Sequence, residues 1–367
     1  MRAAGRRIHA WHLLTIALIL ASTAIFLFAY NHEQDNVSGT VVAEKWCNGN
    51  FNDGSPCTSS VSWSLNNPAP PNVDTTGGVT VQQAIQSSFA SWQGASLNGQ
   101  SIAKLTIMQG PNSSRTAPDV NDCVNVIGFA DPTTSDFPTG TIAFTIPAVV
   151  FGPPPITYTC ADTTSSTYTC PLPSCIVDAD IEFNPNDTFS TADATPANDF
   201  DLQALATHEA GHLLGMDHSG LISSIMFAFG DAGGVPQRGL SVDDVLGIGS
   251  VYPSASFASA VGSLSGTVTL AGTGVFASHV IIIDAQTGSA VVDSLTDTNG
   301  KYQVNVPPGQ YNVLALPLAG IYDISAFGGW ACGYEENAPP CCDPTLNPQQ
   351  CKGTSIAVPT DYSGKFN

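Results

Sequence analysis

The segment that begins at residue 208 reads HEAGHLLGMDHS and contains three histidines, at positions 208, 212 and 218. If this stretch is helical, His208 and His212 lie on one face and can bind the same metal ion. A catalytic zinc takes three protein ligands and keeps a further position for water. Gly215 allows the chain to leave the helix sharply, so His218 can return to the metal. The spacing therefore predicts one zinc ion held by His208, His212 and His218.

Glu209 stands beside the first of these histidines, where its carboxylate can reach a zinc-bound water and act as the general base. The alternative is a set of histidines that are packed or solvated on an ordinary helix. With the composition of this chain, a chance match to the five fixed positions has a frequency of roughly a few in a million. The other histidines, His9, His12, His32 and His279, are remote in sequence. The pattern therefore favours a catalytic metal site.

Three helices are predicted around this site. Apolar residues at helical spacing predict the first at 79–92. The second, at 200–214, carries the histidines and can be capped by Asn198 or Asp199. The third covers Val242–Val251, with Ser241 and Asp244 as a capping box. Candidate strands lie at 105–108, 141–146 and 176–183. The predicted fold class is α+β, with a mixed twisted sheet and three helices in a domain at 44–255.

The chain changes character after a small-residue linker at 253–261. From there the predicted elements are strands only, separated by turns such as Asn299-Gly300 and Pro308-Gly309. The strands are predicted at 265–270, 280–284, 301–306 and 311–315, and, after a Cys-rich insertion at 332–351, at 354–358 and 363–366. This spacing predicts a C-terminal all-β sandwich domain at 262–367.

The composition restricts the partners. The chain has 367 residues, of which 30 are acidic and 10 are basic. Such a surface repels phosphates, so a nucleic-acid partner is excluded. The excess of aspartate could serve Ca²⁺ binding, because short carboxylates suit oxygen-ligand sites, although solubility alone also accounts for it. The sequence does not determine the oligomeric state.

The N-terminal segment 1–36 combines Arg2, Arg6 and Arg7 with an apolar run at 13–30, which predicts a signal peptide or a signal anchor. The run is long for a signal peptide and just long enough to span a bilayer, so cleaved and anchored forms both stay open. In either case the arginines stay inside and the rest of the chain is extracellular. A membrane contact is expected only through this anchor.

The ten cysteines are an even number, which predicts disulfides in an exported chain. Six precede the histidine cluster and four crowd the C-terminal end, which fits bridges formed within each region. Cys47–Cys57 and Cys160–Cys170 are plausible pairs, but spacing alone does not determine the pairing.

The region 44–252 resembles the metzincins and, among them, the matrixins. The resemblance is carried by the HEAGHLLGMDHS segment with Ser219 after the third histidine, by Met226 at the position of the Met-turn, and by the first and last helices. It implies a zinc protease that cleaves a protein or peptide substrate bound along an edge strand, for which 141–146 is the candidate. It also implies that the loop at 227–239 lines the specificity pocket. The second zinc, the inhibitory prodomain and the haemopexin-type domain of animal matrixins are expected to be absent.

The C-terminal region resembles the carboxypeptidase regulatory-like, transthyretin-type β-sandwich. The resemblance rests on Gly266, the strand at 280–284 and the two turns named above. It implies a binding or spacing module, or a stabilising appendage without a ligand.

Together these features predict a secreted or surface-tethered zinc endopeptidase that uses a zinc-activated water and Glu209 as general base. One alternative is an extracellular adhesion or binding protein with a metzincin scaffold, against which the intact Glu209 argues. Another is a zinc hydrolase that acts on a non-peptide substrate, which the extent of the matrixin resemblance disfavours.

Overall fold

The computed structural model describes residues 32–38, 40–47, 60–67, 69–115, 119, 122–129, 137, 140–161, 166–233 and 237–316. The apolar run at 13–30, Cys57, the Cys-rich insertion and the last two predicted strands lie outside the described residues. Among the described residues, no helix is long and apolar enough to cross a membrane.

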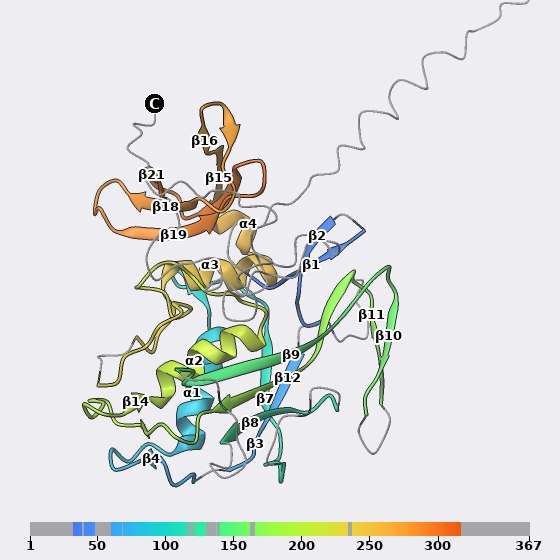
Figure 1. Ribbon diagram of the computed structural model, residues 1–367, viewed down its shortest axis with the longest axis vertical. Helices are drawn as coiled ribbons and strands as arrows, with labels where there is room; N and C mark the ends of the chain where they lie inside the picture. The colour runs from blue at the N-terminus through green and yellow to red at the C-terminus, as the bar shows by residue number, and fades with distance from the viewer. Residues whose placement is uncertain are drawn as a thin grey trace, which may run out of the picture.

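A five-stranded sheet forms the centre of the molecule, with strand order β7-β3-β8-β12-β9 (Figure 1). The strands are β7 (Thr106–Gln109), β3 (Ser60–Leu65), β8 (Asn125–Phe129), β12 (Ser174–Phe183) and β9 (Ala143–Phe151). All neighbours are parallel except β9, which pairs antiparallel with β12. The sheet is therefore mixed, as predicted, and the strand predicted at 141–146 overlaps the first part of β9, which lies at the edge of the sheet and runs on to Phe151.

Two long helices pack on this sheet. They are α1 (Val81–Gln93) and α2 (Leu202–Leu213), and their apolar faces share one buried cluster with the strands. Trp92 of α1 donates its indole N–H to the carbonyl of Thr207 of α2, with an N–O distance of 2.7 Å. This bond and the shared core fix the helix that carries two of the histidines relative to its neighbour.

The helix ends differ in part from the predictions. The first helix begins at Val81 because Thr80 and Gln83 form a capping box. The predicted cap of α2 is wrong: the side chain of Asp201, not that of Asn198 or Asp199, accepts the Ala204 N–H. The third helix, α3 (Val242–Val251), has the predicted bounds and capping box. The expected linker contains a short helix, α4 (Phe257–Ala260).

Strands predominate from Gly262 to Leu316, the part called here the C-terminal strands. β15 (Gly262–Thr267) pairs with β20 (Lys301–Val306), and β18 (His279–Asp284) lies between β19 (Ala290–Leu295) and β21 (Tyr311–Leu316). That the complete region is a sandwich stays a prediction, because residues beyond 316 lie outside the described part.

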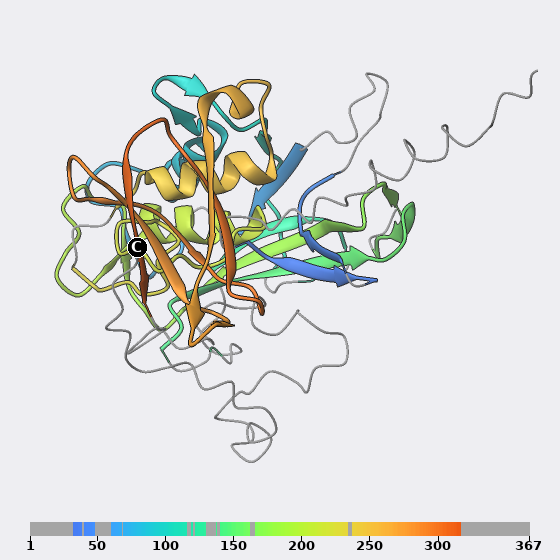
Figure 2. The same ribbon diagram turned by 90° about the horizontal axis from the view of Figure 1, so that it is seen from above.

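A second buried apolar cluster joins the C-terminal strands to the rest of the molecule. Val245 and Leu246 of α3, together with Ile102, pack with Val280 and Val304. Figures 1 and 2 show α3 against these strands, on the side that faces α2. The two halves of the described chain therefore share this second cluster.

The remaining strands are short. They are β1 (Gln34–Val37), β2 (Thr40–Ala43), β4 (Val73–Asp74), β5 (Ser96–Leu97), β6 (Gln100–Ser101), β10 (Ile156–Thr159), β11 (Thr167–Cys170), β13 (Phe189–Ser190), β14 (Phe200–Asp201), β16 (Thr269–Leu270) and β17 (Thr273–Gly274).

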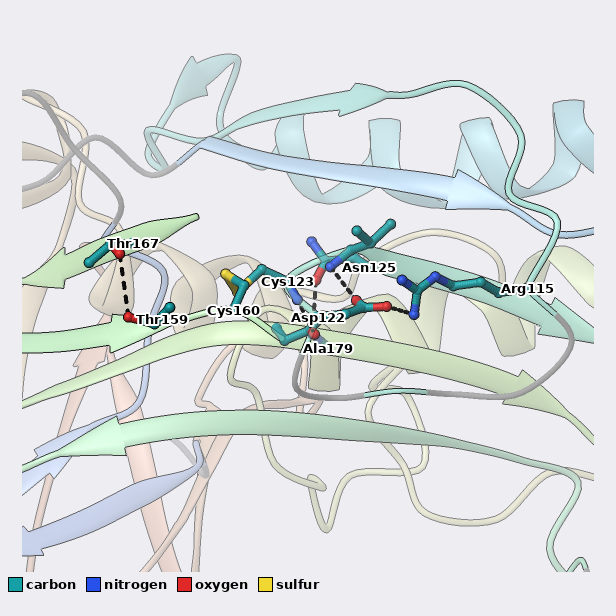
Figure 3. The surroundings of a disulfide bond; sticks show 10 residues. Arg115, Asp122, Cys123, Asn125, Thr159, Cys160, Thr167 and Ala179 are labelled. Carbon is teal, nitrogen blue, oxygen red and sulfur yellow. Dashed lines mark hydrogen bonds and ion pairs between the residues drawn. A yellow bond between two sulfur atoms is a disulfide. The ribbon is translucent and has the colours of Figure 1, made fainter. Parts of the chain in front are cut away.

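Two disulfides are described, Cys123–Cys160 and Cys170–Cys175. The expected pair Cys160–Cys170 is therefore wrong. In the β10–β11 hairpin Cys170 lies opposite Ile156, which places Cys160 four residues along the hairpin. Four residues of strand span roughly 13 Å, so Cys160 and Cys170 are too far apart to form a disulfide. Figure 3 shows Cys160 joined instead to Cys123, next to the Arg115–Asp122 ion pair.

Candidate metal centre and cleft

Helix α2 places His208 and His212 one turn apart, and the chain then turns back to bring in the third histidine. Gly215 has a left-handed backbone with φ of 86°, which ends the helix. The Nε2 atom of His212 lies 3.1 Å from that of His208 and 3.2 Å from that of His218. Among the described residues, this is the group of three ligand-type side chains that could hold a metal ion.

These separations fit zinc. Nitrogen ligands at ~2.0–2.1 Å in a tetrahedron are about 3.3 Å apart. The Nδ1 atom of His208 lies 2.7 Å from the Ile225 carbonyl oxygen, and that of His212 lies 2.8 Å from the Met216 carbonyl oxygen. Because carbonyls only accept, both Nδ1 atoms carry the proton and leave Nε2 free for a metal.

Burial keeps the two helical histidines neutral, which is the form that binds metal. It lowers the pKa of His208 to about 3, and the neighbouring His218 adds to this effect. Burial likewise lowers the pKa of His212 well below its usual value. The donor set and its protonation state therefore both suit a zinc ion.

Glu209 is buried between the histidine helix and the edge strand β9. Thr145 Oγ1 lies 2.7 Å from Glu209 Oε2 and 3.0 Å from the Glu209 carbonyl oxygen. Burial raises the pKa of the Glu209 carboxyl to about 7, against the lowering effect of the Thr145 hydroxyl. A carboxyl with a pKa near neutrality can both take up and release a proton at physiological pH.

Met226 is buried and its carbonyl accepts the Ser219 N–H, next to the third histidine, while α3 supports the turn that contains Met226. Asp244 of α3 accepts the Ile225 N–H at 3.0 Å and bonds the hydroxyl of Ser224. The same carboxylate completes the capping box of α3. The turn therefore depends on α3, and through the Ile225 carbonyl it orients His208.

A cleft of about 660 Å³ opens over this centre. Its lining includes the stretch from Gly140 to Thr145 with Pro147, and also Ile222 and the stretch from Phe227 to Asp231. The three histidines and Glu209 lie on its lining. The loop predicted at 227–239 thus reaches the cleft. Arg238 ties the far end of this loop to Asp201, with Nη2–Oδ2 at 2.6 Å.

The structure adds residues that the sequence did not indicate. Thr145 contacts Glu209 across 64 positions of sequence, which no local pattern reveals. Glu33, from the segment before β1, also lines the cleft, and its N–H donates to the Gly215 carbonyl. The sequence predicts Asp244 only as a helix cap, and its contacts with Ser224 and Ile225 appear only in the folded chain.

Comparison with known proteins also indicates a metalloprotease-type domain in the region that contains the three histidines. The matrixin family model matches residues 167–253, which include all three histidines, Glu209 and Met226. The match supports a matrixin-like metzincin domain and a zinc metalloprotease-type function. No curated protein matches the chain significantly.

Proposed function

We propose that this chain is a zinc-dependent endopeptidase in which His208, His212 and His218 hold the metal and Glu209 is the general base. The observation that carries the proposal is the position of Glu209. Its carboxylate is buried beside the histidines and lies on the same cleft. A protein that only binds ligands on this scaffold has no need of a buried carboxylate at that place.

The chemistry divides between the metal and the chain. Bound zinc would supply a Lewis acid that polarises the peptide carbonyl and acidifies a water molecule. Glu209 takes the proton of the attacking water and later passes it to the leaving amine. Thr145 holds the Glu209 carboxylate in one orientation, so that proton transfer does not wait on side-chain rotation.

The substrate in this proposal is an extended peptide that pairs with the free edge of β9. In the described sheet β9 has a neighbour on one side only, β12. An edge strand at the wall of a cleft can accept a further strand through main-chain hydrogen bonds. Ile222 and Phe229, which also line the cleft, are 78% and 49% exposed and offer apolar contacts to substrate side chains.

We also propose an extracellular location, secreted or tethered through the segment 1–36, on the strength of the N-terminal arginines and apolar run. Calcium sites and the role of the complete C-terminal region stay predictions.

The test compares the full wild-type chain with Glu209→Gln, which keeps the shape of the side chain and removes its basicity. Each protein is assayed for bound zinc and for cleavage of unfolded casein, with and without a chelator. Both should bind about one zinc, and only the wild type should cleave, with a loss of at least ~100-fold in the variant.

Thr159→Ser, on the β10–β11 hairpin outside the cleft lining, is the matched control and should keep full activity. A wild type that binds no zinc, or that binds zinc and cleaves neither casein nor a broad peptide library, would contradict the proposal. Zinc binding without cleavage would favour the adhesion or binding alternative.

A further inference from the structure

The third histidine differs from the other two in its support. His208 and His212 lie on α2, whose hydrogen bonds hold their backbone, whereas His218 lies on the loop that follows. On one side this loop is held by the Met226 carbonyl, which accepts the Ser219 N–H at 2.8 Å. Its other side is turned toward the C-terminal strands.

Asp293 of β19 contacts this loop directly after the histidine. Its Oδ1 accepts the hydroxyl of Ser219 at 3.0 Å, and its Oδ2 accepts the N–H of Gly220 at 2.8 Å. His279 of β18 lies with Nε2 2.7 Å from the same Oδ2. The carboxylate of Asp293 therefore makes three contacts, and two of them are to the two residues that follow His218.

The contact is buried and closely fitted. Asp293 is 2% exposed, Ser219 5% and His279 7%. A Cβ atom added to Gly220 would lie 2.6 Å from the His279 ring and 2.7 Å from Asp293 Oδ2, so only glycine allows this approach. The N–H of Asp293 donates in turn to Asp243 of α3 at 3.1 Å. The loop, β19 and α3 are thus linked by one buried polar network.

We propose that Asp293 is a positioning residue of the metal centre, and that the C-terminal strands hold the loop of the third ligand in place. The inference rests on the proposed function, because it assumes that His218 binds zinc. Groups that orient a ligand indirectly typically change metal affinity or activity by ~10–100-fold when removed. Loss of Asp293 leaves the Gly220 N–H without its acceptor and lets the His218 loop move.

The experiment uses Asp293→Ala in the full chain, with Asp297→Ala as the matched control. Asp297 is also a buried aspartate of this region, and its Oδ1 accepts the N–H groups of Asn299 and Lys301, each at 2.8 Å. Those contacts stay within the C-terminal strands. Both substitutions remove a buried aspartate whose carboxylate makes side-chain contacts within this region, three for Asp293 and two for Asp297, but only Asp293 contacts the His218 loop.

The main readout is the rate at which zinc passes to an excess of chromogenic chelator below the melting temperature. We expect this rate to rise ~10–100-fold in Asp293→Ala and less than about twofold in Asp297→Ala, even where the control melts earlier. In casein or peptide cleavage, kcat should fall and KM should stay nearly constant. Asp293→Asn, which keeps one acceptor oxygen, should show an intermediate rate of zinc loss, and it replaces the alanine variant if that variant does not fold.

Equal zinc-release rates in the wild type and the Asp293 variants would overturn the inference. So would an equal rise in the Asp297 control, because the effect would then be general destabilisation. Both outcomes leave the proposed function intact. A wild type that holds no zinc would instead overturn the proposed function and this inference together.

Discussion

Thr145 on the edge strand and Glu209 on the histidine helix are joined by a 2.7 Å contact between a hydroxyl and a carboxylate. The same hydroxyl lies 3.0 Å from the main-chain oxygen of Glu209. The strand proposed to bind the substrate and the residue proposed to move the proton therefore hold each other in place. A peptide that pairs with β9 would be aligned by the strand that also orients the base.

Substitution of Thr145 by valine, which has nearly the same shape, should test this coupling. Without the hydroxyl the Glu209 carboxylate can rotate, so we expect kcat to fall about tenfold with KM changed less than about twofold. Thr145→Ser restores the hydroxyl and should recover most of the activity. Steady-state cleavage of a fluorogenic peptide measures both constants, and a change confined to KM would contradict the coupling.

Gly215 should not tolerate a side chain. Its left-handed φ of 86° is costly for other residues, by ~1–2 kcal/mol, and an added Cβ would overlap the carbonyl of Glu44. We expect Gly215→Ala to lower the free energy of unfolding by more than about 2 kcal/mol and to weaken zinc binding through Met216, whose carbonyl orients His212. Gly239→Ala has open space around it and should be nearly neutral. Urea unfolding of the two variants makes the comparison.

Arg238 should control the shape of the loop at 227–239. Its guanidinium binds the buried Asp201 through Nε and Nη2 and also the Ala192 carbonyl. Arg238→Met should destabilise the protein by ~1–3 kcal/mol, because Asp201 stays buried without its partner, and should broaden cleavage specificity. Asp193→Asn removes only the exposed partner of Arg238 and should have little effect. Cleavage profiles on a peptide library would contradict this role if Arg238→Met left them unchanged.

Asp178 should make stability depend on pH. Burial, together with the charges of Asp180 and Asp119, raises its pKa from the usual value of 3.8 to about 7. The folded state then binds a proton that the unfolded state has lost, so wild-type stability should fall as the pH rises from about 4 to about 7. Each pKa unit is worth about 1.4 kcal/mol.

Asp178→Asn cannot lose or gain a proton at this position. Its free energy of unfolding should therefore rise relative to that of the wild type as the pH increases from about 4 to about 7. The asparagine side-chain oxygen can still accept the Cys123 N–H that Asp178 accepts. Urea unfolding between pH 4 and pH 8 measures the difference, and parallel stability curves for the two proteins would exclude the effect.

The sequence predicted the elements whose signals are local. The histidine helix and Gly215 follow from spacing, and the capping box of Ser241 and Asp244 marked the start of α3 to the residue. The strand at Lys301–Val306 alternates apolar and polar residues and has the predicted bounds.

Two strands of the central sheet are not predicted, for different reasons. In β3, Ser60–Leu65, serines alternate with apolar residues, which is a strand pattern that the prediction missed, whereas in β8, Asn125–Phe129, every residue is buried and the sequence does not alternate. Asn125 can be buried there because its amide bonds the Ser62 carbonyl and the Ala179 N–H, which lie on two other strands. Such a residue suggests a turn in the sequence, and only the assembled sheet shows why it belongs in a strand.

Contacts between distant segments could not be predicted either. The Cys123–Cys160 disulfide depends on how the β10–β11 hairpin meets the start of β8, and the contact of Asp293 with Gly220 joins regions 73 residues apart. Both depend on tertiary packing, for which a single sequence carries no periodic signature.

The apolar cluster that Val245 and Leu246 share with Val280 and Val304 has a consequence for folding cooperativity. A shortened chain that ends before Gly262 would expose this face of α3 to water and would be prone to self-association. In the intact protein neither half can unfold without exposing the side that the other contributes to this cluster. Heat should therefore unfold the matrixin-like part and the C-terminal strands in one calorimetric transition, with equal van't Hoff and calorimetric enthalpies.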